Sequence, residues 1–185
     1  EFEVGARFAE GNGMEQNFAE ASRWYQRSAT QGFAQAQYRL ATLYERGLGV
    51  KQDVNRAKVW YQRSAEGGNI KAMHNLAVLS AGRTAKTPDY ATAATWFTAA
   101  AERGLADSQF NLAVLHESGL GVGKDQKAAY KWFALAARGG DAEAVKRRDE
   151  LERTMLPADL AQARKEVSGW RAKATDRIAN DARAA

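Results

Sequence analysis

The chain of 185 residues has no cysteine, only two prolines and no long hydrophobic run. Without cysteine it has no disulfide framework, no thiolate zinc site and no cysteine nucleophile. No apolar stretch approaches the roughly 18 residues of a membrane-spanning helix, so we expect no span within this chain. The opening Glu-Phe-Glu-Val does not resemble a signal peptide, and an initiator methionine is missing. We therefore expect a piece of a longer protein, in which a span is possible.

The sequence also lacks a cluster of charged residues of one sign. The net charge of +5 and the pI of about 9.5 would suit a nucleic-acid-binding protein. Basic and acidic residues nevertheless alternate in both 1–140 and 141–185, without a basic block. A solvated helical surface explains this pattern better than a phosphate-binding stripe does. We predict that the chain does not bind nucleic acid.

What the sequence does contain is an internal repeat of 36 residues. Each unit has a tryptophan followed by an aromatic residue, with alanine three residues before and five after it and glycine eight after it. The four tryptophans are Trp24, Trp60, Trp96 and Trp132. We divide the chain into units 1–32, 33–68, 69–104 and 105–140, the first truncated at its start. Residues 141–185 are interpreted as a partial fifth repeat followed by capping helices.

Each unit is predicted to hold two helices separated by a glycine loop. In the second unit, apolar residues from Ala36 to Arg46 follow a helical period, and Gly47-Leu48-Gly49-Val50 then interrupts. The second helices are expected near 18–31, 54–67, 90–103 and 126–139. Their N-caps are expected at Asn17, Asp53, Asp89 and Asp125.

Two positions modify this pattern locally. Glu20 follows Asn17 by three residues, which predicts a capping box. In the third unit Arg83-Thr84-Ala85-Lys86 replaces the glycine loop, and we expect the loop 82–88 to be the most mobile of the four.

In the C-terminal part, residues 141–185, a helix is expected from Asp141 to Met155, and a second amphipathic helix after Pro157 that extends to Trp170.

One helix pair cannot bury its apolar face alone, so neighbouring pairs must stack. The sequence therefore predicts an all-α fold, a right-handed α-solenoid whose first helices line the concave side. The segment from Ala36 to Gly68 reads Ala-x-x-x-Leu-Ala-x-x-Tyr-x-x-Gly-x-Gly-Val-x-x-Asp-x-x-x-Ala-x-x-Trp-Tyr-x-x-Ser-Ala-x-x-Gly. It resembles a Sel1-like repeat, a relative of the tetratricopeptide repeat. This resemblance covers residues 1–140.

The stretch 141–170, with Lys-Arg-Arg-Asp-Glu-Leu and then Pro-Ala-Asp-Leu-Ala-x-Ala, resembles the end of the Sel1 region in PodJ-type polar localisation factors of alphaproteobacteria. Members of that family have cytoplasmic coiled coils, one membrane span and periplasmic Sel1 repeats. The resemblance implies a periplasmic module at the cell pole. Other bacterial envelope proteins with Sel1 repeats have similar ends.

Catalytic and metal-binding patterns are absent from the sequence. His116 shares a packing column with Phe8, Tyr44 and Ser80, and His74 has no His-Glu-x-x-His context. Metal ligation needs three or four convergent donors, and none are suitably spaced. The Gly-x-Gly pairs follow helices rather than strands, so they lack a dinucleotide-binding context. A triad assembled in space stays open, but we predict no enzyme, no cofactor and no metal.

Function is therefore expected on the surface of the first helices. Four columns repeat along this surface, and three of them contain an aromatic, an amide and an apolar series. The candidate partner-binding residues are Tyr38, Arg39, Thr42, His74, Asn75, Val78, Phe110, Asn111 and Val114. Repeating aromatics can anchor a bound peptide, and asparagine offers both a donor and an acceptor to an extended backbone. The alternative that Tyr38 and Phe110 belong to the core stays open.

The predicted function is a non-catalytic scaffold that binds a partner protein or peptide on its concave face. One alternative is binding of peptidoglycan or another glycan, since aromatic side chains stack on sugar faces. A second is a periplasmic regulator of a signalling protein. The weakest is a cell-wall-modifying enzyme, because the Sel1 proteins with that proposed role are rich in disulfides.

Overall fold

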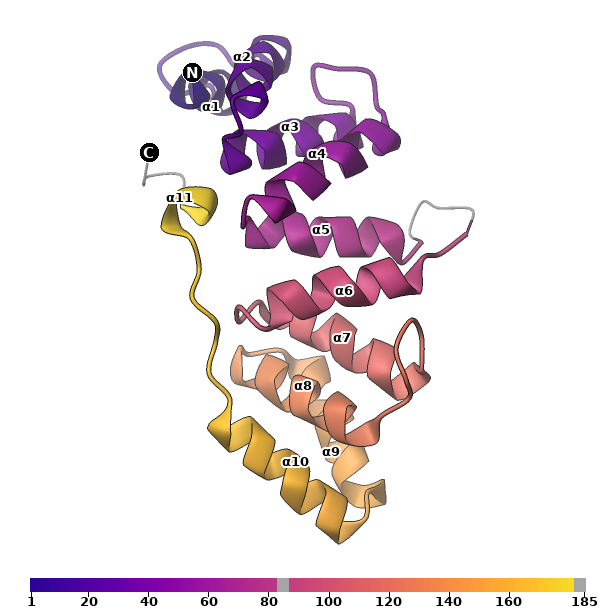
Figure 1. Cartoon of the computed structure of the whole chain (residues 1–185). Helices are drawn as coiled ribbons and strands as arrows, with labels where there is room; N and C mark the ends of the chain where they lie inside the picture. Colours follow the sequence, from indigo (N-terminus) through magenta and orange to yellow (C-terminus); the bar gives the residue numbers. More distant parts are fainter. Residues whose placement is uncertain (83–86, 182–185) are drawn as a thin grey trace. The chain divides into compact units, whose positions relative to one another are not determined.

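A computed structural model describes residues 1–82 and 87–181 of the chain. These residues form helices joined by short loops, and the described part contains no strand (Figure 1). The predicted all-α fold class is thereby confirmed. The irregular segment Arg83–Lys86, on which the expected mobility of the third loop depends, lies outside the described residues.

The helices follow the predicted order closely. Their bounds are α1 Phe2–Glu10, α2 Phe18–Thr30, α3 Ala34–Arg46, α4 Val54–Glu66, α5 Ile70–Ser80, α6 Tyr90–Ala101, α7 Ala106–Ser118, α8 Gln126–Arg138, α9 Ala142–Thr154, α10 Pro157–Gly169 and α11 Arg177–Asn180. The predicted second helices correspond to α2, α4, α6 and α8. Each begins at the expected residue and ends within two residues of the expected end. The short helix α11 has no counterpart among the predictions.

The predicted N-caps are present at all four second helices. The side chains of Asn17, Asp53, Asp89 and Asp125 accept hydrogen bonds from backbone N–H groups in the first turn that follows. Such bonds satisfy donors that have no partner within the helix.

The predicted capping box at Asn17 is wrong. The Asn17 N–H donates to the Phe8 carbonyl at 2.8 Å, while the Glu20 carboxylate pairs with Arg23 at 2.7 Å. In the next repeat the Asp53 N–H donates in the same way to the Tyr44 carbonyl, at 2.9 Å. The preceding helix therefore takes the donor that the Glu20 side chain would have used.

The second glycine of the loop allows successive repeats to approach closely. Gly49 and Gly121 both have a positive φ, and a Cβ on either would collide with the backbone at the start of the preceding repeat's second helix, at Phe18 and Tyr90 respectively. Gly13 has the same backbone conformation, but a Cβ there would meet nothing within 4 Å. The loop at Gly13 belongs to the first helix pair of this chain, and open space surrounds that glycine.

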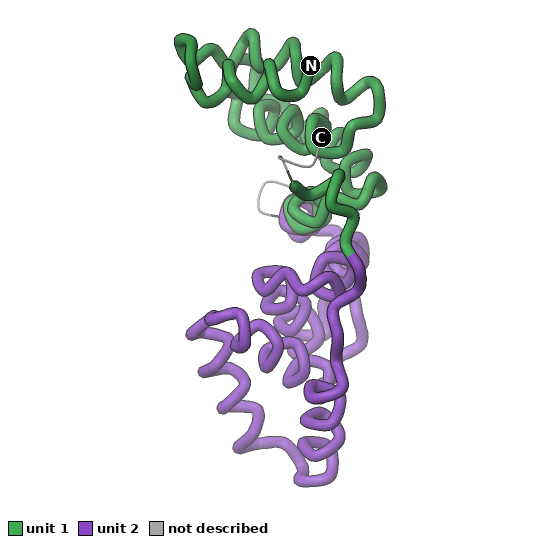
Figure 2. Tube along the Cα trace, turned by 90° about the vertical axis from the view of Figure 1, so that its left-hand side faces the viewer, with its two compact units in different colours: residues 1–76, 175–185 green, residues 77–174 purple. Residues whose placement is uncertain are grey.

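The chain divides into two compact units (Figure 2). Unit 1 contains 1–76 and 175–185, and unit 2 contains 77–174, so the division falls within α5. Tyr25, Leu40 and Tyr61 are among the fully buried side chains of unit 1, and Leu112 and Phe133 among those of unit 2. The division predicted from the sequence has repeats up to residue 140 and a capping region after it. It follows the repeat pattern rather than compactness, and it stays a prediction.

The two expected helices of the C-terminal part are present as α9 and α10. Helix α10 packs against α8, and its Ala163 and Val167 are buried in the core of unit 2. Trp170 ends α10 as its C-cap and is half-buried against the same core. No helix in the described ranges is long and apolar enough to cross a membrane.

Candidate protein-binding surface

In unit 1 the predicted residues lie on α3 and α5. Arg39 is exposed, whereas Tyr38, Thr42, His74 and Asn75 are half-buried. The Tyr38 ring packs at 5.8 Å from the Tyr61 ring, centroid to centroid. Tyr38 therefore contributes to packing and also keeps accessible surface.

The Tyr61 hydroxyl from α4 brings three side chains of this surface together. It donates to Glu45 Oε2 at 2.6 Å, accepts from Asn75 Nδ2 at 3.0 Å, and lies 3.2 Å from Thr42 Oγ1. Burial raises the pKa of Tyr61, and the hydrogen bond to Glu45 acts in the same direction. The amide of Asn75, predicted to hold a partner, is therefore engaged within the protein.

In unit 2 the predicted residues are Val78, Phe110, Asn111 and Val114, all half-buried. The Phe110 and Phe133 rings meet edge to face with centroids 5.4 Å apart. Asn111 Nδ2 donates to the Asp107 carbonyl of its own helix at 2.7 Å. Val78, Phe110 and Val114 pack against the core of this unit, so much of their apolar surface contributes to stability.

The histidine at the predicted packing position, His116, is half-buried on α7. Its backbone carbonyl accepts from the N–H of Asp125 at 2.9 Å, which connects the loop to the helix. Within the described residues, no group of three or more His, Asp or Glu side chains could hold a metal ion.

A polar site that was not predicted from the sequence lies at the start of α3 and α5. We call it the amide clamp and define it by Gln35, Gly68, Asn69 and Ile70. The side chains of Gln35 and Asn69 are 5% and 4% exposed, and both donate to the main chain of the C-terminal segment. Figure 1 shows this segment ending in α11 beside α3. The clamp thus binds a polypeptide that is more than 100 residues away in sequence.

The clamp recognises both main chain and side chain. Gln35 Nε2 donates to the Ile178 carbonyl at 2.6 Å and also contacts the Asp181 carbonyl. Asn69 Nδ2 donates to the Ala179 carbonyl at 2.5 Å, while its Oδ1 accepts from the Ala72 N–H and caps α5.

The Asn180 side chain completes the contact with the clamp. Its Oδ1 accepts from the Ile70 N–H at 2.8 Å, and its Nδ2 donates to the Gly68 carbonyl at 2.9 Å. The Ile70 N–H lies in the first turn of α5 and has no partner within that helix, so Asn180 supplies one.

A departure from the repeat pattern could have identified the clamp. Gln35 and Asn69 each stand at a position where the other repeats have a different residue type: Lys71, Asp107 and Glu143 for the first, and Phe33, Leu105 and Asp141 for the second. Neutral amides at these places serve one site rather than the general packing of repeats. Without the position of the distant C-terminal segment, however, the sequence does not show what they bind.

Beside the clamp lies an open pocket of about 300 Å³. It is lined by Tyr38 and Arg39 of the predicted surface, by Lys71 of α5, and by Asn180 and Asp181 of the C-terminal segment. The clamp and the predicted surface of unit 1 are therefore continuous through this pocket.

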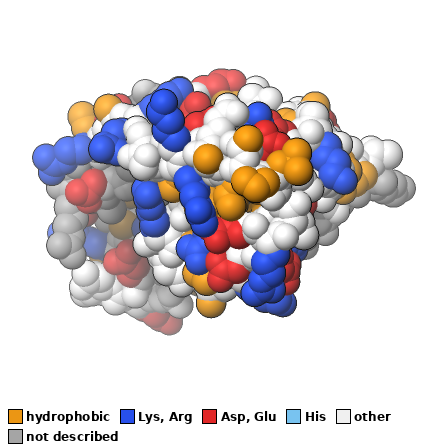
Figure 3. Space-filling model, turned by 90° about the horizontal axis from the view of Figure 1, so that it is seen from below, with side chains coloured by type: hydrophobic (Ala, Val, Ile, Leu, Met, Phe, Trp, Pro, Cys, Tyr) orange, Lys and Arg blue, Asp and Glu red, His pale blue; other side chains and the backbone are white. Residues whose placement is uncertain are grey.

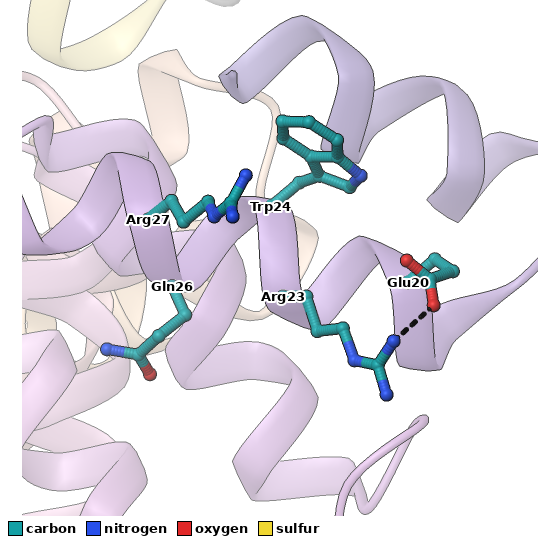
Figure 4. Close-up of a pocket in the computed structure, with 5 residues that line it drawn as sticks. All are labelled: Glu20, Arg23, Trp24, Gln26 and Arg27. Carbon is teal, nitrogen blue, oxygen red and sulfur yellow. Dashed lines mark hydrogen bonds and ion pairs between the residues drawn. The ribbon is translucent and has the colours of Figure 1, made fainter.

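A second hollow surface of unit 1 lies on the second helices α2 and α4. On α2, Arg27 lies over the Trp24 ring at 5.2 Å, and Arg23 pairs with Glu20 (Figure 4). On α4, Arg63 lies over the Trp60 ring at 4.7 Å. A different face, seen from below the orientation of Figure 1, shows Lys and Arg side chains interspersed with Asp and Glu around a small hydrophobic group (Figure 3). The face in that view carries no extended region of one sign among the described residues.

Comparison with known proteins identifies the repeat. The family model described as Sel1 repeat matches four times, at residues 1–33, 34–69, 70–105 and 106–141. The chain is similar to the crystal structure of c5321, described as a protective antigen of uropathogenic Escherichia coli with an SLR fold, with 31% identity and a TM-score of 0.76. It is also similar to a Sel1 repeat protein from Oxalobacter formigenes, with 29% identity and a TM-score of 0.77.

Both alignments cover 91% of this chain. The chain spans only 36% of c5321 and 71% of the Oxalobacter protein. No curated protein matches the chain significantly in sequence. Neither structure is described as a polar localisation factor, so the resemblance of 141–170 to PodJ-type proteins gains no support from these comparisons.

Proposed function

The chain belongs to the Sel1 repeat family, whose repeats generally mediate protein–protein interaction, and from this premise we propose that it is a non-catalytic binding module for a partner protein. The partner would lie as a short segment on the α3 and α5 surface of unit 1. The single observation that carries this proposal is the amide clamp, which holds the main chain of a distant segment through two buried side-chain amides.

Both amide donors of the clamp are buried and hydrogen-bonded while the C-terminal segment occupies the surface, and they lose these acceptors when the segment leaves. A buried amide without a hydrogen-bond partner costs free energy, so a surface that presents such donors favours a main-chain acceptor. Arg39 and Lys71 are exposed beside the clamp and add positive charge. We therefore infer that this surface selects polypeptide segments with free carbonyl groups and acidic side chains.

A site-specific photo-crosslinking experiment tests this proposal. A photo-reactive amino acid is placed at Arg39 or at Lys71 in the protein expressed in its host, and at Val59 of α4 as the matched control. Val59 is 51% exposed and lines the pocket on the second helices. We expect a discrete adduct from positions 39 and 71 and none from 59. Adducts from 59 alone would move the binding surface to the second helices.

We also propose, from the resemblance of the C-terminal part, that the module acts in the periplasm of a bacterium and at the cell pole. Fractionation and localisation of a tagged full-length protein test the compartment and the position. Peptidoglycan is the alternative ligand in that compartment, and sedimentation with purified sacculi separates it from a protein partner. Sedimentation of the module that persists after protease treatment of the sacculi would favour the glycan.

A further inference from the structure

The C-terminal segment lies in the amide clamp as a bound peptide would. We propose that residues 176–181 are an intramolecular ligand, and that a partner segment of the same chemistry displaces them. This inference rests on the proposed function and adds to it the sequence class of the partner. The required pattern is Asp-x-x-Ala-Asn followed by an acidic residue, read from Asp176 to Asp181.

The contacts show which positions of the segment determine binding. Asp176 Oδ1 accepts from the Ile178 and Ala179 N–H groups, which sets the single helical turn. Ala179 is 3% exposed, so its methyl group is buried in the contact, and a larger side chain there would have to displace its neighbours. Asn180 makes reciprocal bonds with Ile70 and Gly68.

Other positions of the segment are free to vary. The Ile178 side chain is 56% exposed, and Arg177 is exposed as well. The segment therefore places little apolar surface against unit 1 beyond Ala179. Because burial of apolar surface supplies most of the free energy of association, a segment held mainly by polar contacts is exchangeable.

The charged residues around the pocket indicate which charge a displacing segment should carry. Asp181 lines the pocket of about 300 Å³ together with Arg39 and Lys71. An acidic residue after the asparagine is therefore favoured in a displacing segment. The open part of the pocket leaves room for a partner to extend toward Tyr38, where the chain's own segment does not fill the surface.

The test uses a fluorescent peptide with the sequence of residues 174–181, titrated into the full chain and followed by anisotropy. Ala179→Leu and Asn180→Ala release the chain's own segment, and Arg177→Ala is the matched control on the same helical turn. An attached segment competes at an effective concentration near the millimolar range, so we expect about tenfold tighter peptide binding to the two released variants. The control should bind like the unchanged chain.

A second variant tests the clamp itself. Asn69→Asp keeps the oxygen that caps α5 but removes the amide that donates to Ala179. Combined with Asn180→Ala, it should abolish peptide binding without lowering the helix content measured by circular dichroism. Equal peptide affinity for the released variants and the unchanged chain, or binding that survives Asn69→Asp, would overturn the proposal.

Three further outcomes also decide against it. If both released variants fail to fold, the segment is a fixed part of unit 1 rather than a ligand. If light scattering shows a dimer that the peptide dissociates, the occupant is the segment of a second copy. If the peptide binds neither the unchanged chain nor the released variants while crosslinking at Arg39 persists, this inference is refuted and the proposed function stands.

Discussion

The Tyr61 hydroxyl donates to Glu45 Oε2 at 2.6 Å and accepts from Asn75 at 3.0 Å, so one buried phenol connects α3, α4 and α5 of unit 1. Tyr61→Phe removes these bonds without changing the ring. We expect a loss of about 1.5–3 kcal/mol in the free energy of unfolding, the range for hydrogen bonds that include a charged acceptor. Urea unfolding measures it.

The control for this variant is Tyr38→Phe, because the two rings lie 5.8 Å apart and the Tyr38 hydroxyl has no part in the bonds made by Tyr61. It should change the free energy of unfolding by less than about 0.5 kcal/mol, as expected for a substitution away from a polar network. Equal losses for the two variants would mean that the Tyr61 network adds nothing to stability.

The glycine loops allow a comparison of two chemically identical substitutions. Gly49→Ala and Gly13→Ala both place alanine at a positive φ, which costs each variant about 1 kcal/mol or more. Only Gly49 faces the backbone of Phe18, so its variant should lose a further 1–3 kcal/mol or so from the forced shift of the loop. Thermal unfolding of the two variants measures the difference. A similar loss for both would contradict close packing between repeats.

Much of the fold could be predicted from the sequence because the repeat carries its signals locally. Asp53 is an N-cap by its own side chain, and the start of α4 follows from it. The capping box failed because the Asn17 N–H is taken by the Phe8 carbonyl, an acceptor nine residues earlier. For Tyr38 and Phe110 the sequence is compatible with both a surface and a core position, and in the structure each is half-buried and packs against another aromatic ring.

The candidate site was less predictable than the fold because its contacts join residues that are far apart in the sequence. Asn75 follows the helical period of its column, yet its amide is used by Tyr61 from another helix. Asn69 was not identified, since the carbonyl that it binds belongs to Ala179, 110 residues away. Contacts of that kind depend on the position of the whole chain rather than on a periodic pattern.

The tryptophans should contribute to stability according to their burial. Trp60 is 8% exposed, whereas Trp24 and Trp96 are half-buried. We expect Trp60→Ala to lower the free energy of unfolding by about 3–5 kcal/mol, the range for deleting a buried large aromatic. Trp24→Ala and Trp96→Ala should each cost less. Chemical unfolding followed by circular dichroism compares them, and equal costs at all three positions would contradict this ranking.

Acidification should weaken unit 2 through Glu152. Its carboxylate accepts from the Tyr130 hydroxyl at 2.6 Å and pairs with Arg164 at 3.1 Å, and these contacts hold the pKa of Glu152 below its ordinary value. A carboxyl whose pKa is lower in the folded state stabilises above its unfolded pKa and loses this contribution as pH falls through the folded pKa.

Glu152→Gln should therefore be less stable than the unchanged chain at neutral pH. The difference should shrink as pH falls below about 4.3, the pKa of an unperturbed glutamate. Urea unfolding of both proteins at pH values on either side of this point checks the prediction. A difference that stays constant or grows on acidification would contradict the assigned interaction.

The most direct measurement of the binding account is the dissociation constant of the cross-linked partner, determined by calorimetry for the unchanged chain, Arg39→Ala and Val59→Ala. Arg39 is exposed on the proposed surface and Val59 on the second helices, so neither substitution should alter the melting temperature appreciably. The account predicts about a tenfold loss of affinity for Arg39→Ala, the scale of an interface anchor worth more than 1 kcal/mol, and none for Val59→Ala. Unchanged affinity for Arg39→Ala with a loss for Val59→Ala would contradict it.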